Sequence, residues 1–227
     1  MADNNDGDDD ERGTSDGRPA TTVVRNYTKG ARTATAFREA ARRQFAEHGY
    51  LNTKVEDIAR EAGRSPASFY NYFDSKADVL ADIAREFHAD TRQQISVPYR
   101  AGQSPRDAVT EAITIFWTTY RDRLGTWSGV FQASMVDTEF LDQWRTIRAE
   151  AIAFIARGVE RAQADGWCPG ADPQLTASAL SSMIEHFCYV WLVQGGDAIG
   201  GAFDEARAIA TLADVWFHAI YWRPDGD

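Results

Sequence analysis

Apolar residues recur every three or four positions through most of the 227-residue chain, which is the spacing expected of amphipathic α-helices. Segments containing proline and glycine, such as residues 97–104 and 166–173, separate the periodic stretches. The pattern predicts helices over residues 30–49, 76–96, 105–124, 126–135, 137–165, 174–194 and 203–222. We therefore expect an all-α fold.

Two shorter helices are predicted between the first two of these, on either side of a turn at Gly63. Thr53 is expected to cap the first short helix with Glu56 as its capping-box partner, and Ser65 is expected to cap the second. Phe69 would anchor the second helix and leave its outer face free. This arrangement suits a helix-turn-helix that reads a DNA major groove, although the spacing alone fits an ordinary αα-hairpin equally well.

The same segment resembles the signature of TetR-type transcriptional regulators, T-x-V-x-x-I-A-x-x-A-G followed by S-x-x-x-x-Y-x-x-F-x-S-K. The matching residues are Thr53, Val55, Ile58, Ala59, Ala62, Gly63, Ser65, Tyr70, Phe73, Ser75 and Lys76. Arg64 replaces a usual aliphatic residue, and Pro66 and Ala67 stand where a glycine commonly follows the turn. These departures concern the operator sequence more than the fold. The resemblance implies a three-helix N-terminal helix-turn-helix domain and a larger C-terminal helical domain for ligand binding and dimerisation.

Composition divides the chain into three expected segments. Residues 1–22 are rich in aspartate, asparagine and glycine and contain few apolar residues, so we expect a disordered acidic tail. Such a tail either competes with DNA for a basic surface or only keeps the chain in solution. Residues 23–75 form the predicted DNA-binding domain, and residues 76–227 the predicted ligand-binding and dimerisation domain.

The formal net charge of −10 looks unsuited to a DNA-binding protein, but its distribution removes the difficulty. Residues 1–20 carry seven acidic and two basic side chains, whereas residues 21–76 carry six acidic and ten basic ones. The positive segment therefore coincides with the predicted helix-turn-helix. Counterion release from DNA requires a basic face, not a basic protein.

Several classes of protein are disfavoured by what the sequence lacks. Cys168 and Cys188 are its two cysteines, and no cluster of cysteine and histidine has the spacing of zinc ligands. No apolar run is long enough to span a membrane, and the N-terminus lacks the pattern of a signal peptide. No nucleophile elbow, phosphate-binding loop or metal-ligand spacing supports an enzyme. We expect a cytoplasmic protein with no cofactor, no metal and no enzymatic activity.

Candidate DNA contacts lie on the outer face of the second short helix and around the starts of its neighbours. They are Thr53, Lys54, Arg64, Ser65, Ala67, Ser68, Tyr70, Asn71, Tyr72 and Lys76. Asn71 can form two hydrogen bonds with an adenine. Lys54, Arg64 and Lys76 suit phosphate, and the resemblance implies the same role for Tyr70. Each residue either makes such a contact or is merely exposed to solvent.

Aromatic side chains are concentrated in the middle helices, where the family binds inducers. The candidate ligand contacts are Phe116, Trp117, Tyr120, Trp127, Phe131, Trp144, Phe154, Met183, His186 and Phe187. Stripes of this kind also fill protein cores, so each residue either lines a cavity or packs the interior. Glu185 and His186 either recognise a polar end of a ligand or are satisfied within the core. The C-terminal helix pattern is similar to the branch typified by the mycobacterial repressor of ethionamide activation.

The helices predicted over residues 174–194 and 203–222 are apolar on more than one face, which indicates a second buried surface. The resemblance implies that these two helices form the interface of a homodimer. We therefore predict a dimeric one-component repressor that binds a palindromic operator and is released by a small apolar ligand. The alternative is a DNA-binding activator or architectural protein without an inducer.

Overall fold

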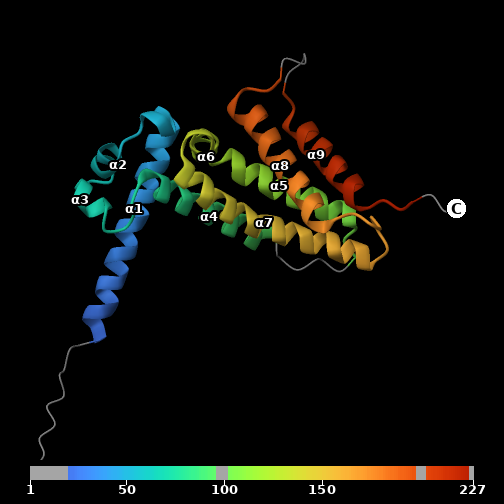
Figure 1. Cartoon of the computed structure of the whole chain (residues 1–227), viewed down its shortest axis with the longest axis horizontal. Coiled ribbons are helices and arrows are strands. Elements are labelled where there is room, and N and C mark those ends of the chain that lie inside the picture. Colours follow the sequence, from blue (N-terminus) through green and yellow to red (C-terminus); the bar gives the residue numbers. More distant parts are fainter. Residues whose placement is uncertain (1–19, 96–101, 198–202, 225–227) are drawn as a thin grey trace, which may run out of the picture. The chain divides into compact units, whose positions relative to one another are not determined.

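A computed structural model describes residues 20–95, 102–197 and 203–224, with side chains described from residue 30 onward. All regular elements within these ranges are helical, which confirms the all-α prediction (Figure 1). The helices are α1 (Ala20–Asn52), α2 (Val55–Glu61), α3 (Pro66–Phe69), α4 (Lys76–Ile95), α5 (Pro105–Arg121), α6 (Leu124–Val136), α7 (Thr138–Ala164), α8 (Pro173–Cys188), the π-helical turn η1 (Tyr189–Val193) and α9 (Glu205–Ile220).

The chain divides into two compact units, residues 1–35 and 36–227. In the first unit the described part is the beginning of α1, which starts at Ala20 and therefore earlier than the predicted residue 30. Most of the expected acidic tail, residues 1–19, lies outside the described residues. The second unit contains the helix-turn-helix and all later helices, so the expected domain boundary after residue 75 stays a prediction.

The turn between α2 and α3 has the predicted geometry. Gly63 has a φ of +64°, a left-handed conformation that glycine adopts without steric cost. The Oγ of Ser65 accepts a hydrogen bond from the backbone N–H of Ser68 at 3.2 Å, and Pro66 occupies the first helical position. The predicted cap and turn of the second short helix are therefore confirmed.

The predicted capping box at the start of α2 is wrong by one residue. Lys54 is the N-cap, and its backbone N–H donates to Oδ2 of Asp57 at 3.3 Å. Thr53 is buried instead, and its hydroxyl contacts the carbonyl oxygens of Gln44 and Gly49 at 3.2 and 2.8 Å. Gly49 interrupts the helical geometry of α1 with a φ of +74°, so its carbonyl is free for this contact. The threonine thus fastens the start of α2 to the end of α1.

The remaining helices pack side by side, and capping residues mark where several of them begin. Helix α7 packs along both α4 and α8, while α5 packs along α9 (Figure 1). Asp137 caps α7 as predicted, accepting a hydrogen bond from the N–H of Phe140 at 3.1 Å. The predicted helix over residues 174–194 ends as an α-helix at Cys188 and continues as the π-helical turn η1.

Helix α6 lies unusually close to the end of α1. A Cβ atom on Gly125 would stand 2.6 Å from the Cα of Ala46, a separation that real atoms do not tolerate. Two turns later, Oε1 of Gln132 accepts a hydrogen bond from the backbone N–H of Tyr50 at 2.9 Å. The hydroxyl of Tyr50 in turn donates to Asp137 at 2.6 Å, between α6 and α7. A missing side chain and two hydrogen bonds therefore hold α6 against α1.

His88 of α4 lies in an aromatic part of the core. Its ring centroid lies 5.9 Å from that of Trp127 and 5.6 Å from that of Trp144. Burial, with further contributions from Arg148 and Arg92, lowers the pKa of His88 from 6.5 to about 4. Because its Nε2 is buried with no hydrogen-bond partner in the described chain, protonation would place an unpaired charge in the core.

The close approach at Gly125 gives a first prediction. Gly125→Ala should lower the free energy of unfolding by about 1–3 kcal/mol, because the added methyl group must displace the backbone of Ala46. Gly129→Ala is the matched control: its Cβ would lie 3.6 Å from Leu80 Cδ1, an ordinary contact. Alanine also favours a helix over glycine, so this variant should be neutral or more stable by up to about 1 kcal/mol. Urea denaturation measures both, and equal stabilities for the two variants would contradict the assigned contact.

The buried histidine gives a second prediction, on pH. The pKa of His88 is lower in the folded chain than in the unfolded chain, so the unfolded state binds the extra proton first as pH falls below 6.5. The neutral His88 thus favours folding at pH 7, and about 2 kcal/mol should be lost between pH 7 and 4.5. His88→Gln should remove that part of the loss, whereas the same substitution of the exposed His186 should retain it. Urea denaturation at a series of pH values makes the comparison, and identical pH profiles for the two variants would rule out this assignment.

Candidate ligand cavity and DNA interface

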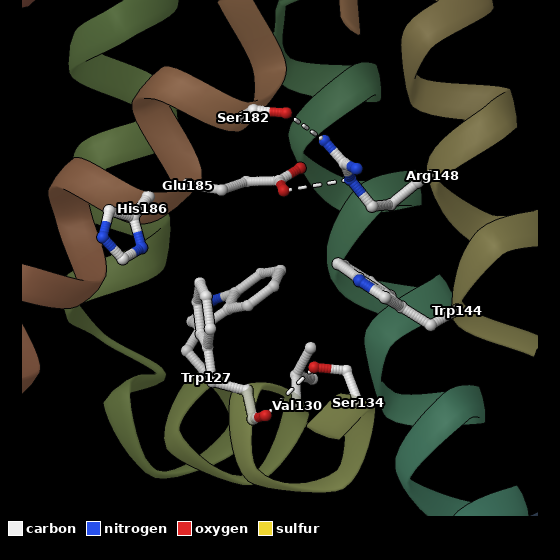
Figure 2. Close-up of a pocket in the computed structure, with 9 residues that line it drawn as sticks. Trp127, Val130, Ser134, Trp144, Arg148, Ser182, Glu185 and His186 are labelled. Atoms are coloured by element: carbon white, nitrogen blue, oxygen red, sulfur yellow. Dashed lines mark hydrogen bonds and ion pairs between the residues drawn. The ribbon is translucent and has the colours of Figure 1, made fainter. Parts of the chain in front are cut away.

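A cavity of about 210 Å³ opens between α6, α7 and α8 (Figure 2). Its lining residues are Trp127, Val130, Phe131, Ser134, Trp144, Arg148, Ser182, Glu185 and His186. The apolar wall comes mainly from α6 together with Trp144 of α7, and the polar wall from Arg148 and the α8 residues. The cavity is therefore amphipathic, with aromatic surface at one side and ionisable groups at the other.

Four of the ten sequence-predicted ligand residues line this cavity. They are Trp127, Phe131, Trp144 and His186. The structure places the other six elsewhere, in core packing or at other surfaces. Trp117 and Tyr120 are fully buried, Phe116 packs edge-on against Phe87, Phe187 stacks on Trp191, Phe154 lies beneath Arg157, and Met183 packs on the cluster around Leu180 and Ile220. Helical spacing predicts which face of each helix is apolar. It does not predict which of these faces line a cavity and which pack against neighbouring helices.

Sequence reasoning missed Arg148 as a cavity residue. On the periodic pattern it is one of several arginines on α7, and nothing local separates it from exposed Arg145. What distinguishes it is the partner on another helix: its Nε lies 3.1 Å from Oε2 of Glu185. The sequence does contain one relevant signal: Glu185 is surrounded by apolar residues in α8. A buried carboxylate is rarely left unpaired, so a cation on another helix was to be expected.

Several buried polar atoms of α4, α5 and α6 have no hydrogen-bond partner among the described residues. They are Nε2 of His88, Nε1 of Trp117 and Trp127, and the hydroxyl oxygens of Thr91 and Tyr120. Folded proteins leave few such groups unsatisfied, and each one costs free energy. Burial also raises the pKa of Tyr120, which keeps its hydroxyl protonated. The interior beside the cavity is therefore more polar than its aromatic composition suggests.

The second site is the exposed surface of α3 and of the turn that follows it, residues 70–72. Phe69 is fully buried, with its ring 5.3 Å from Phe37 in an edge-on contact and 5.6 Å from Phe73. This anchor fixes the rotation of the helix about its axis. As a result Tyr70 and Tyr72 point outward, with 54% and 37% of their surfaces exposed.

Most of the predicted DNA contacts lie on this exposed surface. Lys54, Arg64, Ser65, Ala67, Tyr70, Asn71 and Tyr72 are exposed, and Ser68 is half-buried. Thr53 and Lys76 are different, because the structure engages their polar groups internally. The hydroxyl of Thr53 contacts α1 carbonyls, and Nζ of Lys76 donates to the carbonyl oxygens of Tyr50 and Thr53 at 2.7 and 3.0 Å. Burial lowers the pKa of Lys76, in keeping with this internal position.

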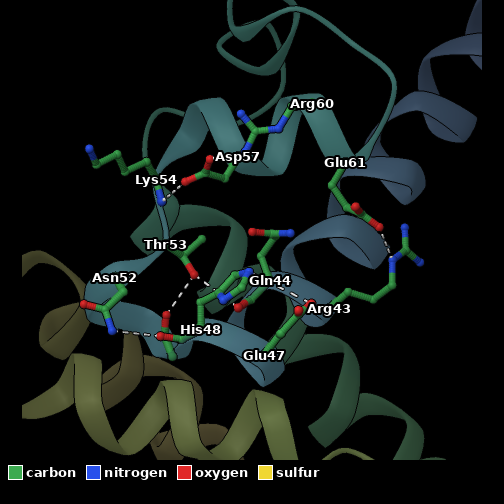
Figure 3. A network of polar contacts seen from close by, with 11 residues as sticks. Arg43, Gln44, Glu47, His48, Asn52, Thr53, Lys54, Asp57, Arg60 and Glu61 are labelled. Atoms are coloured by element: carbon green, nitrogen blue, oxygen red, sulfur yellow. Dashed lines mark hydrogen bonds and ion pairs between the residues drawn. The ribbon is translucent and has the colours of Figure 1, made fainter.

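Several arginines near the helix-turn-helix are neutralised by carboxylates. Arg43 pairs with Glu61 at 2.7 Å, and Arg60 pairs with Asp57, which holds the pKa of that carboxyl below its usual range (Figure 3). By contrast, no carboxylate of the described residues lies within ion-pair distance of Lys54 or Arg64. These two cations are therefore free to meet a phosphate.

The outer faces of α8 and α9 carry exposed apolar side chains. Leu175 is 70% exposed, Val215 49% and Trp222 40%. On α9 the buried face is formed by Ala208, Leu212, Ala213 and Ile220. Leu212 thus belongs to the buried face of α9, whereas Val215 of the same helix is exposed.

None of the helices in the described part of the chain combines the length and the apolar character that crossing a membrane requires. No group of three or more potential ligands among its histidine, cysteine, aspartate and glutamate side chains is arranged to hold a metal ion.

Comparison with known proteins assigns both halves of the chain. The profile described as "Bacterial regulatory proteins, tetR family" matches residues 37–83, and that of "Transcriptional regulator EthR, C-terminal domain" matches residues 109–222. The HTH-type transcriptional regulator EthR of Mycolicibacterium smegmatis is 29% identical over 191 residues, covering 83% of each chain. EthR of Mycobacterium tuberculosis strain H37Rv is 26% identical, covering 74% of this chain and 77% of the relative.

Solved structures show the same fold at lower identity. A TetR-family regulator from Syntrophomonas wolfei superposes with a TM-score of 0.73 at 16% identity, covering 86% of this chain and 99% of that one. One from Rhodococcus sp. gives a TM-score of 0.69 at 21% identity, covering 84% and 99%. The relatives are transcriptional regulators and not enzymes. With a helix-turn-helix in α2 and α3 and an EthR-type C-terminal domain, the chain belongs to the TetR family of transcriptional regulators.

Proposed function

We propose that this chain is a homodimeric one-component repressor that binds a palindromic operator and leaves it when a small ligand occupies the cavity between α6, α7 and α8. The main support for DNA binding is the exposed surface formed by α3 and the turn that follows it. Buried Phe69 fixes this segment so that Tyr70, Asn71 and Tyr72 are free to approach a major groove. Asn71 supplies the amide that can read an adenine, and Ala67 is small enough to allow close approach.

Phosphate contacts in this proposal come from Lys54 and Arg64. Both are exposed and lack a carboxylate partner within the described structure, so their charge is available to displace counterions from DNA. Thr53 and Lys76 are left out of the proposed interface, since their side chains are bound to backbone carbonyls. They support it indirectly by fixing α2 against the end of α1.

Dimerisation is proposed through α8 and α9. Exposed Leu175 on α8, Val215 on α9 and Trp222 just beyond the end of α9 are apolar surface that a second copy can cover. A twofold interface uses the same patch on both subunits, and it would place two α3 helices in symmetric positions. A palindromic operator has the same symmetry, which is why dimer and operator are proposed together.

Helix α6 offers a route from the cavity to the DNA-binding helices. Trp127, Val130 and Phe131 of this helix line the cavity, while Gly125 and Gln132 contact the end of α1. A ligand that shifts α6 would therefore also shift α1, because the approach at Gly125 leaves no space to absorb the movement. In this proposal the ligand favours a conformation with lower operator affinity, and the size of the effect equals its preference for that conformation.

Operator binding tests the proposed DNA interface. Fluorescence anisotropy with duplexes tiling the upstream region of the chain's own gene, at two salt concentrations, should reveal one site with specific binding at physiological salt. Arg64→Ala should weaken binding to every duplex and reduce the slope of log affinity against log salt by roughly two, since a dimer loses two phosphate contacts. Arg145→Ala is the control: it removes one positive charge at an exposed position of α7, away from α3, and should leave the slope unchanged. Equal slopes for both variants would exclude Arg64 from the interface.

A charge on the proposed dimer face tests the assembly. Val215→Glu should give a folded monomer by sedimentation velocity, because two copies of the carboxylate would be buried at the twofold interface. Specific operator affinity should fall together with dimerisation. Val136→Glu introduces the same change at an exposed valine at the end of α6 and should remain dimeric. A dimeric Val215→Glu variant would place the interface elsewhere.

A further inference from the structure

The cavity wall holds a charge pair that links α7 to α8, between half-buried Arg148 and buried Glu185. Nε of Arg148 lies 3.1 Å from Oε2 of Glu185, and its Nη2 donates to Oγ of Ser182 at 3.0 Å (Figure 2). Oε1 of Glu185 accepts a hydrogen bond from the hydroxyl of Ser181 at 2.8 Å. Both partners line the cavity, and the side chain of Glu185 is only 8% exposed. The pair therefore forms part of the cavity wall and not of the outer surface.

The pair is only partly satisfied by hydrogen bonds. Nε of Arg148 faces Oε2 of Glu185 and is the one guanidinium nitrogen within reach of that carboxylate. Burial raises the pKa of Glu185, and this effect is opposed by Arg148 and by the hydrogen bonds from Ser181 and Arg148. A guanidinium has five N–H donors and a carboxylate can accept about four hydrogen bonds, so both groups keep unused capacity. Taking such a pair out of water costs more than the attraction usually returns. An ion pair with unused hydrogen-bonding capacity, placed in a cavity wall, is suited to bind the polar group of a ligand.

The other side of the cavity is aromatic and apolar. Trp127, Phe131 and Trp144 supply ring surface, and Val130 adds an aliphatic contact. In Figure 2 the rings of Trp127 and Trp144 lie on the side of the cavity away from Ser182 and its contact with Arg148. A ligand of this shape must place an apolar body among the rings and a polar head toward Arg148 and Glu185.

The charges of the pair select the head group. A carboxylate head would be attracted by Arg148 but would stand beside the buried carboxylate of Glu185. An ammonium head would be attracted by Glu185 but would be repelled by the positive charge of Arg148. An uncharged head that both accepts and donates hydrogen bonds suits the two groups at once, because each keeps its ionic partner. A primary carboxamide has this combination in its carbonyl oxygen and N–H groups.

We propose that the effector is a small aromatic or aliphatic molecule with an uncharged carboxamide-type head, whose carbonyl accepts from Arg148 and whose N–H donates to Glu185. The inference rests on the proposed function, in which this cavity is the effector site. It extends that proposal by naming the chemistry of the ligand and the two residues that decide it.

Three compounds of equal size test the head group. Binding of 3-phenylpropanamide, 3-phenylpropanoate and 3-phenylpropylammonium to the purified full-length chain is measured by tryptophan fluorescence and calorimetry, without DNA. The amide should bind at least tenfold more tightly than either ion, since only it leaves the charges of the pair balanced. Equal affinities, tighter binding of either ion, or no binding of the amide would overturn the proposal.

A substitution at Glu185 tests whether the Arg148–Glu185 pair recognises the ligand or only holds α7 against α8. Glu185→Gln leaves Arg148 without its counter-charge, so the preference should move to 3-phenylpropanoate by tenfold or more. Glu150→Gln makes the same change at an exposed carboxylate of α7 and should keep the amide preference. A Glu185→Gln variant that weakens all three ligands equally would show that the pair only holds α7 to α8, and would contradict the proposal.

Failure of this inference can be told apart from failure of the repressor proposal. Ligand binding is measured without DNA, and operator binding is measured without ligand. A chain that binds a specific operator but shows no amide preference contradicts the head-group chemistry alone. A chain that prefers the amide but binds no operator supports the head-group chemistry and contradicts the repressor.

Discussion

The contact between α6 and the end of α1 is the constraint on which the rest of the arrangement depends. Gly125 has no Cβ, and this allows the backbone of α6 to approach Ala46 more closely than any other residue would permit. Gln132 then bonds to the backbone of Tyr50, and Tyr50 bonds to Asp137 at the start of α7. The helix that carries four cavity residues is thus fastened to the helix that supports the helix-turn-helix. Close-packed interiors transmit displacement instead of absorbing it, so this contact makes communication between the two sites physically reasonable.

The interior around the cavity contains polar groups that cost stability. A neutral buried histidine, an ion pair with incomplete hydrogen bonding and several unpartnered aromatic N–H and O–H groups lie in one region. An apolar core of the same volume would avoid these costs. Sites for small molecules commonly combine apolar walls with a few convergent polar groups, and the cavity between α6, α7 and α8 has this composition.

Charge in the DNA-binding part is arranged locally. The chain as a whole carries a formal charge of −10, and carboxylates of α2 and α4 neutralise Arg38, Arg43 and Arg60. Lys54 and Arg64, at the start of α2 and in the turn, are left without such partners in the described structure. Intramolecular pairing thus concentrates the usable positive charge beside α3. Overall charge is a poor guide to nucleic-acid binding when ion pairs redistribute it in this way.

The sequence by itself determined the helical fold, the positions of most helix ends and the outward face of α3. These features depend on local signals: helical periodicity, Gly63 in a left-handed conformation, Ser65 and Asp137 as caps, and Phe69 as an anchor. The tertiary structure alone decided which side chains of equal local character share a site. Arg148 differs from Arg145 in facing Glu185 of another helix, and Trp127 lies beside the cavity whereas Trp117, which is equally buried, does not. Lys76 likewise looks like a phosphate ligand in sequence, yet it is occupied by carbonyls 23 and 26 residues away along the chain. Periodicity fixes the direction of a side chain within its own helix, whereas cavities and ion pairs depend on how separate helices pack.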